Sequence, residues 1–140
     1  MRKKNALLVI DAQFDFCHPN GSLYVPGADK DMVKLRDFIL KNSPKIDHIC
    51  VTLDSHPVND ISHPSFWMDK DGNFPPPFTQ ITLADINAGK WAPRFSPQEA
   101  IKYVTELEAQ GQFPHFIWPE HCLIGSKGAA LHDELMAALI

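Results

Sequence analysis

Residues 5–11 read Asn-Ala-Leu-Leu-Val-Ile-Asp, an apolar run that ends in an acid. A short unbroken run of this kind predicts a strand buried on both faces, as in a parallel sheet. Residues 46–54, Ile-Asp-His-Ile-Cys-Val-Thr-Leu-Asp, predict a second such strand, which also ends in an acid. Residues 115–118 predict a third short strand, which ends at Pro119.

Helical patterns separate these predicted strands. Apolar residues recur at helical spacing over residues 29–40, 97–110 and about 128–138. For the second of these helices, Ser96 is the predicted N-cap and Gly111 the predicted C-terminal stop. The alternation of strands and helices predicts an α/β fold with a parallel sheet flanked by helices.

The stretch between the second and third predicted strands is different in character. Residues 57–97 have little periodicity and many prolines, including Pro75-Pro76-Pro77. We expect a long excursion here, and such loops are usually functional or pack over a site. A chain of 140 residues has the size of one domain. We therefore expect a single domain over residues 1–140, with a proline-rich insert at about 64–96.

The composition excludes several classes of function. Hydrophobic residues make up 44% and charged residues 21% of the chain, as in ordinary globular proteins. The net charge of −4 gives no basic surface for nucleic acid, and no apolar run is long enough to span a membrane. The three cysteines are widely spaced, which favours reduced thiols and a cytoplasmic location over a disulfide framework.

Polar residues follow the predicted strands at their carboxyl ends, where open α/β sheets bind ligands. Asp11 ends the first strand, Asp54 ends the second with His56 just beyond it, and His121 follows the third. Two imidazoles and a carboxylate from Asp54, His56 and His121 form a plausible metal-ligand set with open positions. The alternative is that the aspartates only cap turns and that the Asp-x-His triplet occurs by chance.

Three segments, in order, resemble motifs of the nicotinamidase/isochorismatase-like cysteine hydrolases. Residues 7–16 resemble the opening strand and the Asp-x-Gln-x-Asp-Phe motif of nicotinamidases. Residues 52–57 are similar to their Asp-x-His-Pro metal motif, and residues 118–122, followed by Gly125 and Gly128, to their Trp-Pro-x-His-Cys segment. The resemblance covers nearly the whole chain and implies the N-terminal part of a three-layer isochorismatase-like fold.

The resemblance also implies roles for single residues. Asp11 would be the general base that takes the proton from a nucleophilic thiol. The three ligands named above would bind a divalent ion, usually zinc. Phe16 and Trp118 would sandwich the ring of a small amide substrate, although core packing is an equally open interpretation for Phe16. His63 lies one sequence position away from the place where some members of the family have an extra metal ligand.

The chain departs from the family in two respects. The insert makes nicotinamide itself uncertain as the substrate. In addition, no residue matches the catalytic lysine and cysteine, which the family carries further along its chain. Cys122 belongs to the metal motif, Cys17 follows the first motif, and Cys50 is predicted to be buried in a strand and inert. We expect the remaining strands beyond Ile140, or a homo-oligomer or a complementing C-terminal segment that completes the sheet.

Three functions remain open at this point. The first is a metal-dependent cysteine hydrolase of amide bonds, in which this segment supplies Asp11 and the metal site. The second is a catalytically silent metal-binding or assembly module without a nucleophile. The third is a metal-dependent phosphatase that uses Asp11; Gln13 stands where an aspartyl-phosphate enzyme would have its second acid, which disfavours it.

Overall fold

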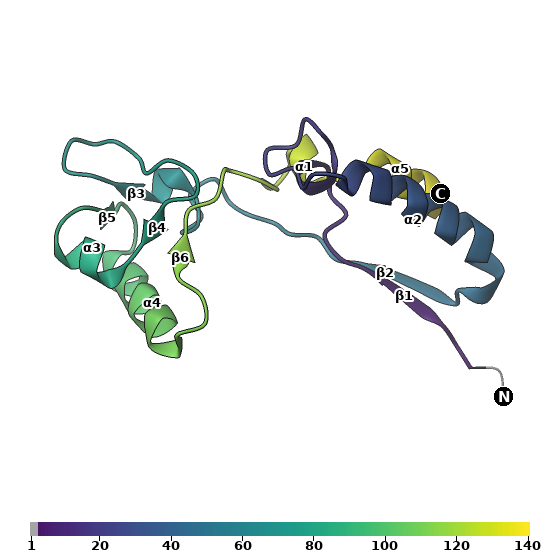
Figure 1. The fold of residues 1–140 in the computed structure, drawn as a ribbon, viewed down its shortest axis with the longest axis horizontal. Helices are drawn as coiled ribbons and strands as arrows, with labels where there is room; N and C mark the ends of the chain where they lie inside the picture. The colour runs from purple at the N-terminus through teal and green to yellow at the C-terminus, as the bar shows by residue number, and fades with distance from the viewer. Residues whose placement is uncertain (1–2) are drawn as a thin grey trace. The chain divides into compact units, whose positions relative to one another are not determined.

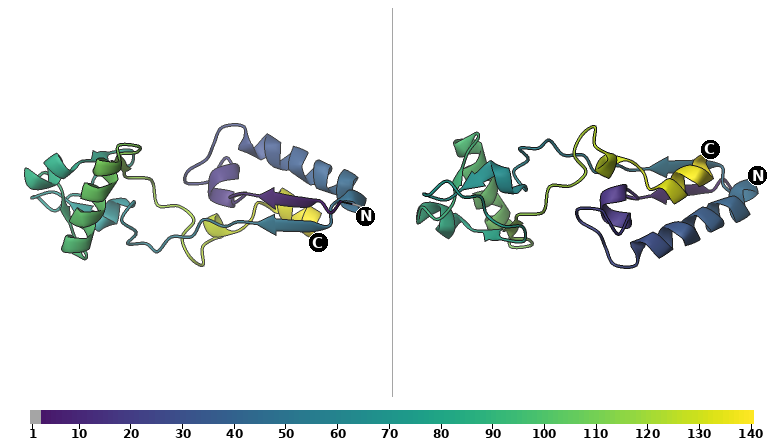
Figure 2. Two further views of the ribbon diagram at one scale, coloured as in Figure 1. Left: turned by 90° about the horizontal axis from the view of Figure 1, so that it is seen from below. Right: turned by 90° about the horizontal axis from the view of Figure 1, so that it is seen from above.

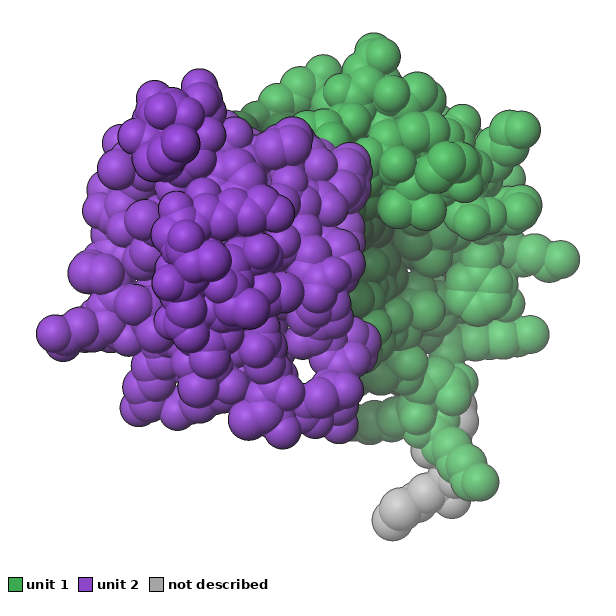
Figure 3. All heavy atoms as spheres, turned by 60° about the vertical axis from the view of Figure 1, so that its left-hand side comes forward, with its two compact units in different colours: residues 1–56, 121–140 green, residues 57–120 purple. Residues whose placement is uncertain are grey.

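The computed structural model describes residues 3–140 and divides the chain into two compact units. Unit 1 comprises residues 1–56 and 121–140, and unit 2 comprises residues 57–120 (Figure 3). Unit 2 is therefore inserted, in sequence, into unit 1. Each unit is described by itself below.

Unit 1 is built on a βαβ arrangement. Strands β1 (Ala6–Val9) and β2 (His48–Val51) are parallel, with Ala6 opposite His48 and Val9 opposite Val51. The connection between them contains the long helix α2, as Figure 1 shows. This helix, α2 (Ala28–Asn42), is the longest element of the unit. The other helical elements are short: α1 (Phe14–Cys17), η1 (Ser43–Lys45), η3 (Lys127–Ala129) and α5 (Asp133–Leu139). The predicted α/β fold with a parallel sheet is confirmed.

The core of unit 1 lies between the strand pair and two helices, α2 and α5, which can be followed in Figure 2. Ile39 of α2 and Leu135 of α5 are buried there together with Val9 of β1. Leu7, Ile49 and Val51 of the strands pack against them. Because side chains alternate along a strand, these residues define the one face of the pair that the helices cover.

The opposite face of the strand pair is exposed in the described part of the chain. Leu8 retains 60% of its surface, and Cys50 is also exposed. The prediction that both strands are buried on both faces is therefore wrong for these residues, and so is the prediction that Cys50 is buried. The continuous apolar run reflects one covered face and one apolar face that no described residue covers.

Unit 2 contains more regular structure than the predicted excursion. Four two-residue strands form two antiparallel pairs, β3 with β5 and β4 with β6. The elements of the unit are η2 (Pro64–Phe66), β3 (Trp67–Met68), β4 (Gln80–Ile81), α3 (Leu83–Asn87), β5 (Ala92–Pro93), α4 (Pro97–Gln110) and β6 (His115–Phe116). Its core is formed by Phe66, Trp67, Ile81, Trp91, Ala100, Val104 and Ile117.

The predicted third strand does not join the parallel sheet. It forms β6, in which His115 and Phe116 lie opposite Ile81 and Gln80 of β4 in an antiparallel pair. The physical reason is that the insert supplies its own strand partner within unit 2. The prediction of a three-stranded parallel sheet is therefore wrong for the described residues, which contain two parallel strands.

The helices agree better with the sequence. Helix α4 has the predicted bounds, and Gly111 closes it with a φ of 66°. Ser96 occupies the predicted N-cap position, but its φ is 39° and its side chain makes no capping hydrogen bond. Helix α5 begins at Asp133, later than the predicted residue 128, because the 3₁₀ turn η3 occupies the preceding stretch. None of the helices in residues 3–140 combines the length and the apolar character needed to cross a bilayer.

Candidate metal centre

Three side chains of unit 1 converge on one point. Asp54, His56 and His121 each offer one ligand atom, and these atoms lie within 4.8 Å of one another. Nε2 of His56 is 2.9 Å from Oδ1 of Asp54, and Nε2 of His121 is 3.3 Å from Oδ2 of the same carboxylate. The centroids of the two imidazole rings are 4.7 Å apart. Each imidazole therefore directs its own Nε2 atom toward the Asp54 carboxylate.

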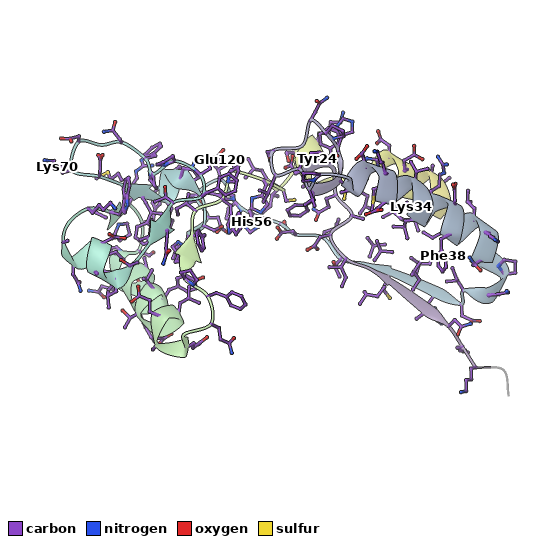
Figure 4. The ribbon with its side chains drawn as sticks, in the orientation of Figure 1. Tyr24, Lys34, Phe38, His56, Lys70 and Glu120 are labelled. Carbon is purple, nitrogen blue, oxygen red and sulfur yellow. The ribbon has the colours of Figure 1, made fainter. Side chains whose placement is uncertain are left out.

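The chain brings these residues together by a short parallel contact rather than by a third strand of the sheet. Asp54 and His56 lie in the segment that follows β2, and His56 is labelled in Figure 4. The backbone N–H of His56 donates to the carbonyl of Cys122 (3.1 Å), and the N–H of Ile124 donates to the carbonyl of His56 (3.0 Å). These two bonds align residues 122–124 with His56, in the segment that follows β2, and His121 immediately precedes the aligned residues.

The donor set suits a divalent cation. His121 is buried, and Asp54 and His56 are half-buried, so the point on which they converge is only partly open to water. Two imidazole nitrogens and one carboxylate are ligands that zinc and related ions accept, and three protein ligands leave a position for water or a substrate. The residues present therefore fit the metal that the sequence led us to expect.

Asp11 lies at the carboxyl end of β1 in an unusual backbone conformation. Its φ is 53°, in the left-handed region that a non-glycine residue adopts only at a cost. The hydroxyl of Thr52 donates to Oδ1 of Asp11 (2.9 Å) and accepts the backbone N–H of the same residue (3.1 Å). Thr52 thus fixes both the backbone and the carboxylate of Asp11. Sequence reasoning missed this role, although Thr52 opens the second motif.

Two further residues of the first motif were not predicted as part of the site. Gln13 and Asp15 are both buried, and their side chains bond to the backbone of the segments that carry the candidate ligands. Their occurrence in the Asp-x-Gln-x-Asp-Phe motif was the available signal. Nothing in the sequence indicates that their partners are backbone groups.

The candidate aromatic residues belong to different units. The ring of Phe16 lies 5.5 Å from that of His121, centroid to centroid, within unit 1. Trp118 belongs to unit 2, where its ring contacts Phe78 and Phe116 with centroid distances of 5.9 Å and 6.2 Å. His63 also belongs to unit 2; it is fully buried and its Nδ1 lies 3.4 Å from the carbonyl of Val58.

The environments of the cysteines differ. Burial raises the pKa of the Cys122 thiol to about 12, and the carboxylates of Asp54 and Asp15 add to the shift. The carboxylate of Asp11 shifts the pKa of the same thiol in the same direction. Burial also raises the pKa of Cys17. Neither thiol has the lowered pKa of an activated nucleophile.

Comparisons with known proteins agree with this fold, although no protein-family profile matches the chain. The nicotinamidase of Saccharomyces cerevisiae is 28% identical over 134 residues, which cover 96% of this chain and 51% of the relative. The nicotinamidase of Acinetobacter baylyi is 30% identical over 130 residues, which cover 93% of this chain and 44% of the relative. The crystal structure of the yeast nicotinamidase with the inhibitor nicotinaldehyde matches with a TM-score of 0.63 and 25% identity, over 96% of this chain and 51% of the other.

The parallel strand pair, its helices and the convergent polar residues define an α/β scaffold that carries a candidate metal site. Over nearly its whole length the chain is similar to nicotinamidases, in sequence and in fold. It spans about half the length of the curated relatives that it matches.

Proposed function

We propose that this chain forms part of a metal-dependent cysteine hydrolase that cleaves the amide bond of a small molecule such as nicotinamide. The observation that carries the proposal is the convergence of the ligand atoms of Asp54, His56 and His121 in the unit that also contains Asp11. The similarity to nicotinamidases supports the same reaction class. In this proposal, residues 1–140 belong to one family domain into which the segment around 64–96 is inserted.

The three candidate ligands would hold a divalent ion, for which we propose zinc because of the imidazole-carboxylate donor set. When bound, such an ion would supply a Lewis acid that orients and polarises the substrate. We propose the two aromatic residues Phe16 and Trp118 as contacts for the substrate ring. The ring of Phe16 lies beside that of His121, which supports this role.

Asp11 is the proposed general base. Its carboxylate would take the proton from an attacking thiol and later return one to the leaving amine, while the hydroxyl of Thr52 holds one carboxylate oxygen in place. The two buried thiols of unit 1 are poor candidates for the nucleophile because their pKa values are raised. The proposal therefore takes the nucleophile and the catalytic lysine from a complementing segment other than residues 1–140.

The second candidate function is a metal-binding or assembly module that performs no hydrolysis. The raised pKa values of Cys17 and Cys122 favour it, because neither of these two buried thiols is activated as a nucleophile. The two functions share the metal site and differ in turnover. They are therefore separated by measuring metal content and ammonia release on one sample.

The experiment uses the protein purified from its natural source, with its intact mass determined, and assays ammonia release from nicotinamide. We expect turnover that falls by about 100-fold or more in Asp11→Asn, as for the loss of a general base. Asp37→Asn is the matched control, since this exposed acid of unit 1 forms a surface ion pair with Arg36 and the variant should leave the rate unchanged. Bound metal without turnover on any amide would reject the hydrolase and leave the binding module.

A further inference from the structure

We infer that Gln13 and Asp15 are positioning residues for the metal ligands, with Gln13 fixing Asp54 and Asp15 fixing the segment of His121. The inference rests on the metal site of the proposed function, but it does not depend on the reaction. It assigns a physical role to two buried polar side chains that sequence reasoning left unexplained.

Gln13 holds the backbone of Asp54 by two hydrogen bonds. Its Oε1 accepts the N–H of Asp54 (2.8 Å), and its Nε2 donates to the carbonyl of Asp54 (2.8 Å). The side-chain amide thus pairs with Asp54 as a neighbouring strand would. A third bond, from Nε2 to the carbonyl of Ala129 (2.9 Å), uses the remaining amide hydrogen. Because Gln13 is fully buried, water cannot replace these bonds, and the backbone that carries the Asp54 carboxylate is held in place.

Asp15 holds the second part of the ligand set. Its Oδ2 accepts the backbone N–H of Cys122 (2.7 Å), and its Oδ1 accepts the N–H of Ser22 (3.1 Å). The short distance to Cys122 is typical of a charge-assisted bond. Cys122 has a φ of 47°, a left-handed conformation that needs such support. His121 immediately precedes this residue, so the bond determines how its imidazole approaches Asp54.

Gly128 shows how closely the structure surrounds Asp15. A Cβ at position 128 would overlap the Asp15 carboxylate, so only glycine leaves this carboxylate in its place. Gly128→Ala would therefore displace Asp15 while leaving its chemistry intact. This substitution therefore disturbs the hydrogen bonds of the Asp15 carboxylate without removing a hydrogen-bonding side chain.

A role in positioning predicts a result that a role in stability alone does not. The affinity of the folded protein for a metal is insensitive to modest losses of global stability, provided that the folded form dominates. A positioning residue changes that affinity directly, because the ligands lose their alignment. Loss of outer partners of metal ligands typically weakens binding by about 10- to 100-fold.

The matched control is Tyr24, which also lies in unit 1 (labelled in Figure 4). Its hydroxyl donates to Oδ1 of Asp29 (2.6 Å) and accepts the N–H of Gly27 (3.0 Å). Tyr24→Phe therefore removes two hydrogen bonds from the same unit, and neither of them involves a candidate ligand. Its effect on metal affinity should be within about threefold, below the range for partners of metal ligands.

The experiment measures the zinc dissociation constant of the 140-residue chain by competition with a chelator, with the folded fraction of each variant checked by circular dichroism. Gln13→Met, which keeps the side-chain length, and Gly128→Ala should each raise the constant by about tenfold or more. Affinities of folded Gln13→Met and Gly128→Ala equal to that of Tyr24→Phe would overturn the inference.

Two further outcomes are also decisive. If the unmodified chain binds no zinc, the metal site of the proposed function fails, which is distinct from the failure of Gln13 and Asp15 to matter in a chain that binds it. If Gln13→Met does not fold, Gly128→Ala decides the role of this segment: a tenfold loss of affinity supports positioning, and an unchanged affinity rejects it.

Discussion

Each of the two units is stabilised internally by a different kind of contact. Unit 2 has a continuous apolar core in which Trp67, Val104 and Ile117 are fully buried. Unit 1 has an apolar core on one face of its strand pair, whereas its ligand-bearing edge depends on buried polar side chains, above all Gln13 and Asp15. The comparison teaches that the inserted segment folds around hydrophobic packing and that the candidate site is organised by directional hydrogen bonds.

The strongest test of this comparison concerns the core of unit 2. Trp67→Ala should reduce the stability of that unit by about 3–5 kcal/mol, because it leaves a large cavity at a fully buried position. All three tryptophans of the chain lie in residues 57–120, so the fluorescence of Trp91 and Trp118 follows unit 2 alone in a denaturant titration. A loss below about 1 kcal/mol, far under the usual range, would show that this core does not stabilise the unit.

The second test compares the two faces of β1 and β2. Leu135→Ala removes a fully buried side chain that packs on the covered face and should cost about 2–5 kcal/mol. Leu8→Ala on the exposed face is the control and should change stability by less than about 0.5 kcal/mol. Both are measured on the 140-residue chain by far-ultraviolet circular dichroism. Equal losses would mean that the exposed face is covered in solution, for example by a second copy.

The smallest effects are expected at two helix starts of unit 2. Thr82 makes a reciprocal capping box with Asp85 at the start of α3, so Thr82→Ala should cost about 1 kcal/mol. Ser96 makes no capping hydrogen bond at the start of α4, and Ser96→Ala should change stability by less than about 0.5 kcal/mol. Thermal unfolding followed by tryptophan fluorescence compares the two. A larger loss at Ser96 than at Thr82 would reverse this assignment of the caps.

The sequence predicted those features that depend on local periodicity or on motif spacing. Helices α2 and α4 were predicted because their apolar residues repeat at helical spacing, and Asp54, His56 and His121 were expected to lie close together from their places after predicted strands. The partner of β6 could not be predicted, because the pairing of two-residue strands leaves no pattern in the sequence. The roles of Gln13 and Asp15 were also missed, since both side chains bond to backbone groups, which every residue carries.

The exposed face of the strand pair illustrates a further limit of sequence patterns. A continuous apolar run predicts burial on both faces, but it cannot say which residues supply the cover. In the described residues, α2 and α5 cover one face, and Leu8 and Cys50 of the other face remain exposed. An apolar run therefore indicates that a strand needs covering residues on both faces, but it does not identify those residues.

The most direct test of the candidate metal centre is the zinc stoichiometry of the 140-residue chain, measured by equilibrium dialysis on the unmodified protein and on His121→Ala. The geometry predicts one ion per chain, with an affinity that falls by more than about 100-fold in the variant, beyond the usual effect of losing an outer partner. Absence of zinc binding, or binding that His121→Ala leaves unchanged, would contradict the assignment of Asp54, His56 and His121 as metal ligands.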